Sequence, residues 1–274
     1  MRSPFAALLA VATALALSFL ILPILAIFVD IPPGRLLDGM NDPAAVDALL
    51  VTLKTTLIAN ALILLVGTPA AYLIATNAFR GKAVLVTAVE LPLVLPPAVA
   101  GIGLLAAFGR FGLLGGGLDF LSLSIPFTQV AVVFAVIFVA SPFYLRAAIS
   151  AFESVDATLT GAARTLGAGP ARTFLRVALP LASGGLGAGW ALSFARGIGE
   201  FGATIMFAGS LQGVTQTLSL AVYEQFDVNF DVALAIGAEL VVVSAFLLLA
   251  VKLVPSWTRS SSPSITLSAP FASR

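Results

Sequence analysis

The chain has 274 residues, of which 59% are hydrophobic and only 10% are charged, and its net charge is +1. A soluble domain carries about 25% charged residues, so this composition excludes a soluble monomer and indicates an integral membrane protein. The small net charge gives no support for nucleic acid binding, and the absence of Cys and His excludes disulfides, thiol or imidazole catalysis and the usual zinc sites.

Six apolar segments are each long enough to cross a bilayer as a helix of about 20 residues. They are residues 5–29, 48–75, 83–108, 128–149, 181–208 and 232–254. The first is longer than the apolar region of a signal peptide, so we expect residues 1–29 to be a retained anchor helix. We predict an all-α membrane protein with six transmembrane helices, a five-helix core over residues 48–254, and a Ser-rich, disordered cytoplasmic tail over residues 255–274.

The basic residues predict the orientation of these spans, because cytoplasmic segments carry an excess of Lys and Arg. With both termini in the cytoplasm, ten basic residues fall inside and two, Arg35 and Arg110, fall outside. The inner residues are Arg2, Arg80, Lys82, Arg146, Arg164, Arg172, Arg176, Lys252, Arg259 and Arg274. We therefore predict that the amino and carboxyl termini both lie inside.

The longest internal segment, residues 146–180, is rich in small, basic and helix-breaking residues. TLTGAARTL predicts a short helix capped by Thr158 or Thr160, and GAGP at residues 167–170 ends it. PARTFLRVALP predicts a second short helix. The pair fits an interfacial hairpin whose Arg side chains meet lipid phosphates, or a docking element for a soluble partner whose groove Phe174 would fill.

Five ionisable residues lie within the predicted spans, where each costs free energy unless it has a partner, water or a function. They are Lys54, Glu90, Arg196, Glu200 and Glu239. Arg196 and Glu200 are four residues apart and can pair on one helix face, either as a structural ion pair or as part of an anion path or gate. For Lys54 and Glu239 we favour structural roles.

Three prolines follow Glu90 in the third span, and each removes a backbone donor and kinks or breaks a helix. They are Pro92, Pro96 and Pro97. Broken helices at membrane depth are tolerated where they line a cavity or pack against protein. The segment is thus an ordinary proline kink or, as we prefer, part of a pathway or gate.

The inner segment GAARTLGAGPARTFLRVALP resembles the EAA loop of permease subunits in binding-protein-dependent ABC importers. That pattern has Glu-Ala-Ala, three residues, Gly, nine residues, Ile, one residue and Leu-Pro. The chain matches it with Ala162, Ala163 and Gly167 and with Leu179-Pro180, but has Gly161 for the Glu and Val177 for the Ile. Residues 90–115 and 196–225 are similar to the molybdate branch of this family, whose near relatives carry sulfate, thiosulfate or tungstate.

The resemblance implies an ABC importer permease that is not an enzyme and has no catalytic residue, metal or cofactor of its own. Its implied partners are a second copy, two ATPase subunits that hold ATP and Mg, a periplasmic or extracellular oxyanion-binding protein, and the lipid of the inner membrane. The implied ATPase-coupling residues are Gly161, Ala162, Ala163, Arg164, Gly167, Arg172, Phe174, Arg176, Leu179 and Pro180.

Two further groups of candidate residues follow from the same resemblance. The gate or translocation path residues are Glu90, Pro92, Pro96, Pro97, Arg196, Glu200 and Phe201. The residues expected to face the binding protein are Arg110, Gln212, Thr215 and Gln216. The alternative is that these outer segments are ordinary solvated loops.

The alternatives to a molybdate permease are a permease for sulfate, thiosulfate or tungstate, a self-sufficient secondary transporter or channel, and a membrane-embedded enzyme. Paired broken helices in inverted repeats would favour a secondary transporter. The sequence has no convincing second copy of its Pro-broken span. An enzyme would need a Ser/Lys, Tyr or carboxylate set, and Lys54 has no serine in its span.

Overall fold

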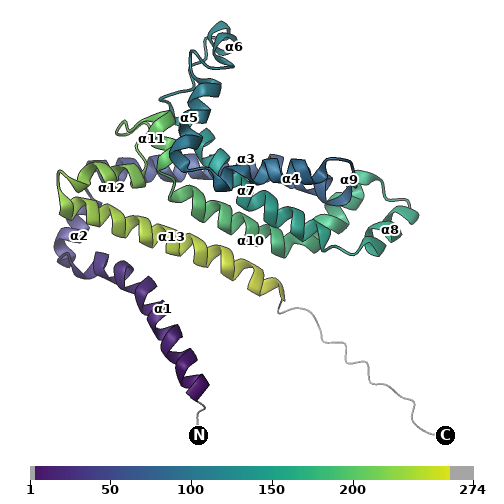
Figure 1. The fold of residues 1–274 in the computed structure, drawn as a ribbon, viewed down its shortest axis with the longest axis horizontal. Coiled ribbons are helices and arrows are strands. Elements are labelled where there is room, and N and C mark those ends of the chain that lie inside the picture. Colours follow the sequence, from purple (N-terminus) through teal and green to yellow (C-terminus); the bar gives the residue numbers. More distant parts are fainter. Residues whose placement is uncertain (1–3, 260–274) are drawn as a thin grey trace.

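The computed structural model describes residues 4–259 and is built from helices throughout that range (Figure 1). The elements are α1 (Pro4–Val29), α2 (Pro33–Met40), α3 (Pro43–Thr76), α4 (Lys82–Val94), α5 (Pro97–Phe108), α6 (Gly115–Phe120), α7 (Gln129–Glu153), α8 (Ala157–Thr165), α9 (Pro170–Thr173), the π-helix η1 (Phe174–Ala178), α10 (Leu179–Ile198), α11 (Gly202–Ala208), α12 (Leu218–Phe226) and α13 (Phe230–Arg259). The predicted tail beyond Arg259, like Arg2 and Arg274, lies outside the described residues, so the prediction of disorder there stays a prediction.

Two of the long helices begin at capping residues that can be recognised in the sequence. Asp42 accepts a hydrogen bond from the Ala44 amide at 2.8 Å and caps α3, whose first residue is Pro43. Thr128 caps α7 in the same way, through the Ala131 amide. These side chains satisfy amides that have no partner inside the helix, which fixes where each long helix begins.

The centre of the bundle is formed by α3, α7 and α10, which pack side by side along most of their length. Small side chains such as Ala59, Ala140 and Ala182 are fully buried there, together with Tyr144 of α7. The Tyr144 hydroxyl and the Thr68 hydroxyl of α3 are 2.6 Å apart, so this buried hydroxyl has a hydrogen-bond partner. Smaller clusters join α5, α7 and α11, and α3, α12 and α13.

Five described helices are long and apolar enough to span a membrane, or six if the bent pair α4 and α5 forms one span. The third predicted span is therefore not one straight helix, because α4 and α5 meet at a bend of 115°. Leu95, in extended conformation, and Pro96 separate the two helices, and Pro97 opens α5. Pro92 lies inside α4 and does not end it.

The fifth predicted span also differs from one continuous helix. α10 ends at Ile198, and the short helix α11 begins only at Gly202. At its other end α10 extends further than predicted, because α9, η1 and α10 follow one another without a gap from Pro170 to Ile198. The predicted second short helix of the internal loop is thus the first part of this 29-residue helix.

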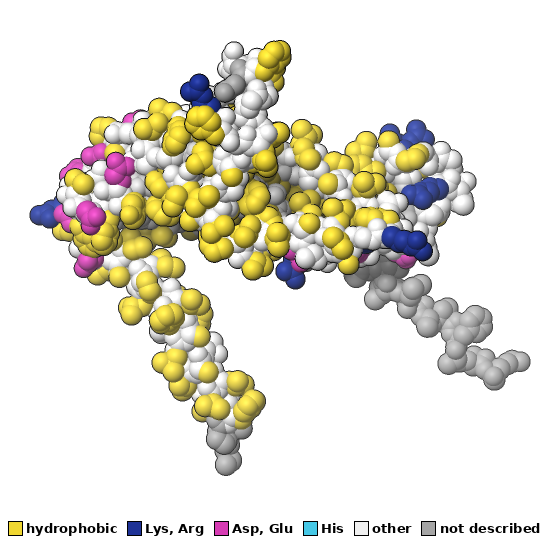
Figure 2. All heavy atoms as spheres, turned by 45° about the horizontal axis from the view of Figure 1, so that its top comes forward, with side chains coloured by type: hydrophobic (Ala, Val, Ile, Leu, Met, Phe, Trp, Pro, Cys, Tyr) yellow, Lys and Arg dark blue, Asp and Glu magenta, His cyan; other side chains and the backbone are white. Residues whose placement is uncertain are grey.

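α1 lies away from the bundle in Figure 1, and the most apolar part of the helix is exposed along its whole length. Such a helix is stable only in lipid or against another protein, because water does not tolerate an exposed apolar surface of that size. The bundle itself has two distinct ends: Figure 2 shows Lys and Arg gathered over α8 and α9, and Asp and Glu gathered over the end formed by α2 and α12.

Candidate functional site: an exposed loop and a double helix break

The inner loop begins at Asp156, whose carboxylate accepts a hydrogen bond from the Thr158 amide at 2.8 Å. Asp156 therefore caps α8, and the expectation that Thr158 or Thr160 caps it was wrong, because the helix starts two or four residues earlier than those caps would place it. The hydrogen bonds from Thr158 hold the pKa of the Asp156 carboxyl below its ordinary value, since they stabilise the charged form.

Gly167 ends α8 in the left-handed conformation, with φ of +84°. The amides of Gly167 and Ala168 donate to the carbonyls of Arg164 and Ala163, each at 3.0 Å. An L-residue with a Cβ is strained in this conformation, which is why the position requires glycine or a tolerant residue such as Asn. Pro170 then opens α9, as predicted.

Phe174 packs inside the chain, although its sequence position suggested a ring that fills a partner's groove. Its ring centroid lies 4.8 Å from that of Tyr72 and 6.2 Å from that of Phe152. These three rings hold the start of the long helix against the ends of α3 and α7. Of the other candidate coupling residues, Leu179 and Ala163 are half-buried, and the exposed ones are Gly161, Ala162, Arg164, Gly167, Arg172, Arg176 and Pro180.

A cavity of about 410 Å³ lies beneath this loop, where the ends of α3 and α7 face α8. Tyr72 and Thr76 come from α3, Phe152 from α7, and Gly161 and Arg164 from α8. The loop therefore combines small exposed residues, which permit a partner to approach its backbone, with a hollow between it and the bundle.

The two helix breaks predicted to form a gate contact each other. A Cβ placed on Gly202, at the start of α11, would lie 2.8 Å from the Cβ of Pro97, at the start of α5. One turn further along α5, a Cβ on Gly101 would lie 2.6 Å from the carbonyl oxygen of Ala203. The bend between α4 and α5 is thus packed against the break between α10 and α11, and glycines permit the contact.

The ion pair predicted between Arg196 and Glu200 is present at this double break. Nη2 of Arg196 lies 2.6 Å from Oε2 of Glu200, which is only 1% exposed. The other carboxylate oxygen of Glu200 accepts a hydrogen bond from the Ala203 amide at 2.7 Å. One buried side chain therefore joins the last turn of α10 to the first turn of α11.

The remaining charged residues of the spans are spread over other parts of the bundle. Glu90 of α4 lies 3.5 Å from Nε of Arg146 of α7, so Arg146, expected in the inner loop, instead pairs with a neighbouring helix. Lys54 donates a hydrogen bond to Gln129 at 2.8 Å. Glu239 of α13 is buried, and its Oε2 has no hydrogen-bond partner among the described residues. Glu90 thus pairs with Arg146 and not with Arg196.

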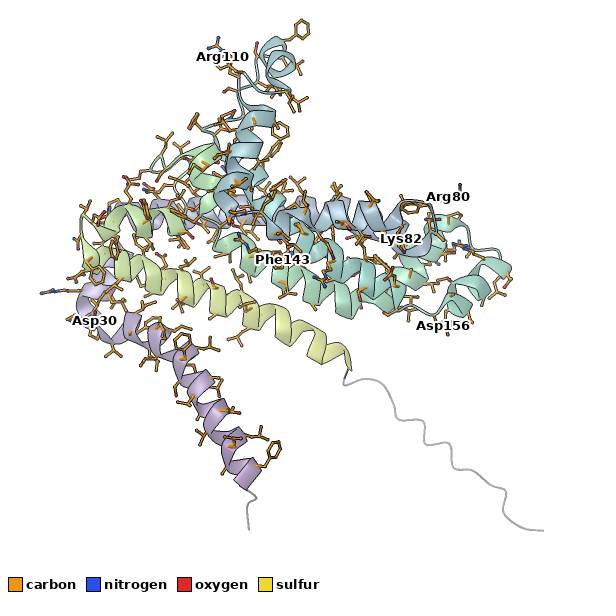
Figure 3. The ribbon with its side chains drawn as sticks, in the orientation of Figure 1. Asp30, Arg80, Lys82, Arg110, Phe143 and Asp156 are labelled. Atoms are coloured by element: carbon orange, nitrogen blue, oxygen red, sulfur yellow. The ribbon has the colours of Figure 1, made fainter. Side chains whose placement is uncertain are left out.

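Two of the residues expected to face a binding protein are buried instead. Thr215 is fully buried, and its hydroxyl accepts a hydrogen bond from the Leu211 amide at 3.0 Å. Gln216 is 4% exposed and donates to Glu224 and to Ser210. Their hydrogen bonds stabilise the turn that precedes α12. Gln212 donates a hydrogen bond to Asp47 at 3.3 Å and is exposed. Arg110 is also exposed at the surface (Figure 3).

The sequence pattern did not predict the close contact between α7 and α10. A Cβ on Gly185 or Gly189 would lie 2.5 or 2.7 Å from the Cβ of Ala151 or Ala147. Small residues four apart on both helices thus face each other, which is a common membrane helix interface. The spacing of Gly185 and Gly189 was visible in the sequence, but its partner helix was not.

Within residues 4–259, no group of three or more Asp or Glu side chains could hold a metal ion. The side chains of the loop and of the double break likewise form no convergent nucleophile and base. What the geometry offers is mechanical: an exposed loop at one end of a continuous helix, and a charged, glycine-rich break at its other end.

Comparisons with known proteins agree with this description. Residues 63–260 match the model of a family described as the binding-protein-dependent transport system inner membrane component. The molybdenum transport system permease protein ModB of Mycobacterium tuberculosis is 42% identical over 233 residues, which cover 85% of this chain and 88% of that protein. ModB of Escherichia coli K12 is 42% identical over 177 residues, which cover 64% of this chain and 77% of that protein.

Two solved structures share the fold. A chain of a bacterial alginate ABC transporter, in complex with an alginate-bound periplasmic protein, superposes with a TM-score of 0.68 at 18% identity and covers 93% of this chain and 94% of its own. A chain of the inward-facing MetNI methionine ABC transporter has a TM-score of 0.60 at 19% identity, with 77% of this chain and 94% of its own covered.

Proposed function

The chain belongs to the binding-protein-dependent transport system inner membrane component family, and from this premise we propose that it carries molybdate into the cytoplasm. It is the membrane-spanning permease subunit of an ABC importer and not an enzyme, since ATP hydrolysis in this family is done by a separate ATPase. The observation that carries the proposal is the 42% identity, over 85% of the chain, to a permease named for molybdenum transport.

In this proposal one long helix connects the inner loop, at its start, to the double break, at its end. The helix from Pro170 to Ile198 has 29 residues and would reach about 40 Å if straight. Because the rings of Tyr72, Phe152 and Phe174 hold its start, a push on the loop is passed into α3, α7 and α10 together. At the far end the same helix stops at the Arg196–Glu200 pair, where it meets the bent pair α4 and α5.

The gate role of this break is a proposal that rests on its geometry. A break can change its angle at low cost where a straight helix cannot, because only a few backbone dihedrals change. The guanidinium of Arg196, 27% exposed, would attract a dianion toward the break, while Glu200 prevents the site from trapping it. Glu90, Pro92, Pro96, Pro97 and Phe201 would move with the same hinge.

The proposed assembly is supported by the fold shared with ABC transporters, one of which was solved in complex with a periplasmic protein. The permease works with an ATPase and a binding protein. We infer that two copies of the chain pair in the cytoplasmic inner membrane, both termini inside, with two ATPase subunits under their loops. ATP and Mg would be held by the ATPase, and the chain itself would hold no cofactor. The binding protein would select among molybdate, tungstate and sulfate.

Reconstitution tests this function. Liposomes that contain the permease and its ATPase, supplied with the binding protein, should take up molybdate only with ATP inside, and the permease alone should hydrolyse no ATP. Gly167→Trp should abolish uptake, because a bulky side chain in a left-handed turn blocks docking. Gly167→Asn, which tolerates the turn, should retain it.

Three outcomes contradict the proposal. Uptake driven by an ion gradient through the permease alone would favour a secondary transporter. Uptake of sulfate in preference to molybdate would change the cargo. Full uptake by the Gly167→Trp variant would remove the loop from the mechanism.

A further inference from the structure

The cavity beneath the inner loop is lined by residues of α3, α7 and α8. Its volume of about 410 Å³ has room for several side-chain atoms from another molecule, and it opens where α8 turns away from α3 and α7. Its floor is made by Tyr72 and Phe152, and its rim by Thr76, Thr160 and Arg164. Figure 3 places this end of the bundle around Asp156 and Lys82, beside the exposed helix α8.

Gly161 is the residue that leaves the cavity open. No atom lies within 4 Å of the position that its Cβ would occupy, and the residue itself lines the cavity. The loop pattern that the chain resembles has a glutamate at this position. A glutamate here would lie three residues before Arg164 on the same helix and could pair with it. The chain has no side chain at that place.

The charges around the cavity are not balanced within the chain. Glu153 is the acidic residue that lines it, and its carboxylate is already paired with Lys82 at 3.0 Å. Arg164 has no hydrogen bond or ion pair among the described residues. Residues 157–180 contain Arg164, Arg172 and Arg176 but no Asp or Glu. Figure 2 shows the resulting basic end of the molecule.

We propose that this cavity receives a carboxylate side chain of the ATPase subunit, which pairs with Arg164 beside Gly161. The acid that the loop pattern carries on the permease is then supplied by the partner, into the space that Gly161 leaves. This inference rests on the proposed function and adds to it one ion pair, in which the permease supplies the cation and the ATPase supplies the anion. Partial shelter of the pair by Tyr72 and Phe152 makes it stronger than an exposed surface pair.

The test uses the full-length permease in lipid nanodiscs and the ATPase subunit that co-purifies with it, with the dissociation constant as the readout. Arg164→Glu and Gly161→Glu should each weaken binding at least about tenfold, because each places a like charge against the incoming carboxylate. Gly161→Gln fills the same space without charge and should weaken binding less than Gly161→Glu. Gly161→Ala adds only a methyl group and should weaken binding least of the three Gly161 variants.

Arg80→Glu is the matched control for charge alone. Arg80 is exposed at the same end of the molecule but does not line the cavity (Figure 3). At an ionic strength of about 0.15 M its charge is screened beyond roughly 8 Å, so its reversal should change binding much less than the reversal of Arg164. A Lys substitution at one Asp or Glu of the ATPase should restore binding to the Arg164→Glu variant and thereby identify the partner carboxylate.

The proposal is overturned if Gly161→Glu binds the ATPase as tightly as the wild type or more tightly, since the acid would then belong on the permease. It is also overturned if free molybdate binds the permease alone in a manner that Arg164→Glu abolishes, because the cavity would then be an anion site. If no ATPase co-purifies with the wild-type chain, the proposed function fails with it. If the ATPase binds all variants equally, only this contact fails.

Discussion

At the scale of single residues, the Glu200 carboxylate makes both an ion pair and a hydrogen bond to the backbone. Oε2 faces Arg196 at 2.6 Å, and Oε1 accepts the Ala203 amide at 2.7 Å. A buried charge costs free energy unless both its charge and its lone pairs are satisfied. The pairing of Arg196 with Glu200 could be predicted from their spacing. The capping of α11 could not, because it depends on the helix break between them.

The two roles of Glu200 can be separated by substitution. Glu200→Gln keeps an oxygen for the Ala203 amide but leaves Arg196 unpaired, so we expect a loss of about 2 kcal/mol of unfolding free energy, moderated by the partial exposure of Arg196. Glu200→Ala removes the cap as well and should cost more. The midpoint of denaturation in lipid nanodiscs measures both changes.

The control is a double variant that removes the ion pair but keeps the cap. Arg196→Met with Glu200→Gln leaves no unpaired charge, and it should recover most of the stability that Glu200→Gln loses. Equal stability of the Glu200→Gln variant and the wild type would show that the pair contributes nothing.

At the scale of elements, the contact between α7 and α10 holds the centre of the bundle. Their backbones approach closely because Gly185 and Gly189 of α10 face Ala151 and Ala147 of α7. In the proposed mechanism this close contact would make α7 and α10 move together when the loop is displaced. The apolar surface of α10 alone did not reveal this face, because glycines lie on more than one side of it.

Substitution of these glycines tests the contact. Alanine favours a helix over glycine by about 1 kcal/mol, and Gly187 has no atom within 4 Å of its Cβ position, so Gly187→Ala should be neutral or stabilising. At Gly185 and Gly189 the added methyl group meets a partner methyl below 3 Å, and overpacking costs about 1–3 kcal/mol.

The Gly185→Ala/Gly189→Ala variant should therefore unfold at lower denaturant concentration than the wild type and transport more slowly. Gly187→Ala serves as its matched control. Identical unfolding of the double variant and the control would mean that α7 and α10 do not approach as closely as described.

At the scale of the whole molecule, charge is sorted along the bundle. The basic end holds α8 and α9, and the acidic end holds α2 and α12 (Figure 2). The predicted orientation places the basic end in the cytoplasm, and it stays a prediction. Arg35 at the acidic end is paired with Asp231 at 3.0 Å, so it adds little to the field there.

The chain contains no cysteine, so single cysteines can report orientation without any background. Leu166 is 88% exposed beside Gly167, and Leu113 is 91% exposed between α5 and α6. A membrane-impermeant maleimide should label Leu166→Cys only from the cytoplasmic side and Leu113→Cys only from the outside. The reverse pattern would contradict both the orientation and the docking of the ATPase.

The same two variants report the docking of the ATPase. Addition of the ATPase subunit should protect Leu166→Cys from the maleimide, since Leu166 lies in the loop that the ATPase would cover. Leu113→Cys should stay fully reactive and thereby show that the reagent and the protein are intact.

The sequence alone determined the membrane environment, the approximate spans, the loop after α7 with its Gly167 turn, and the Arg196–Glu200 pair. Each of these depends on composition or on residues within about four positions of one another, so local chemistry decides it. The family resemblance rested on the loop pattern and on residues 90–115 and 196–225, and the match over residues 63–260 bears it out.

Only the tertiary structure decided which side chains face each other across helices. It buried Thr215 and Gln216, packed Phe174 against Tyr72, and set Gly202 against Pro97. The physical reason is that these helices are apolar on nearly every side, so the sequence contains no stripe that tells one face from another. Pro96 and Pro97 mark the break between α4 and α5, but the packing of α5 against α11 and the cavity beside Gly161 arise from long-range contacts, which no local pattern encodes.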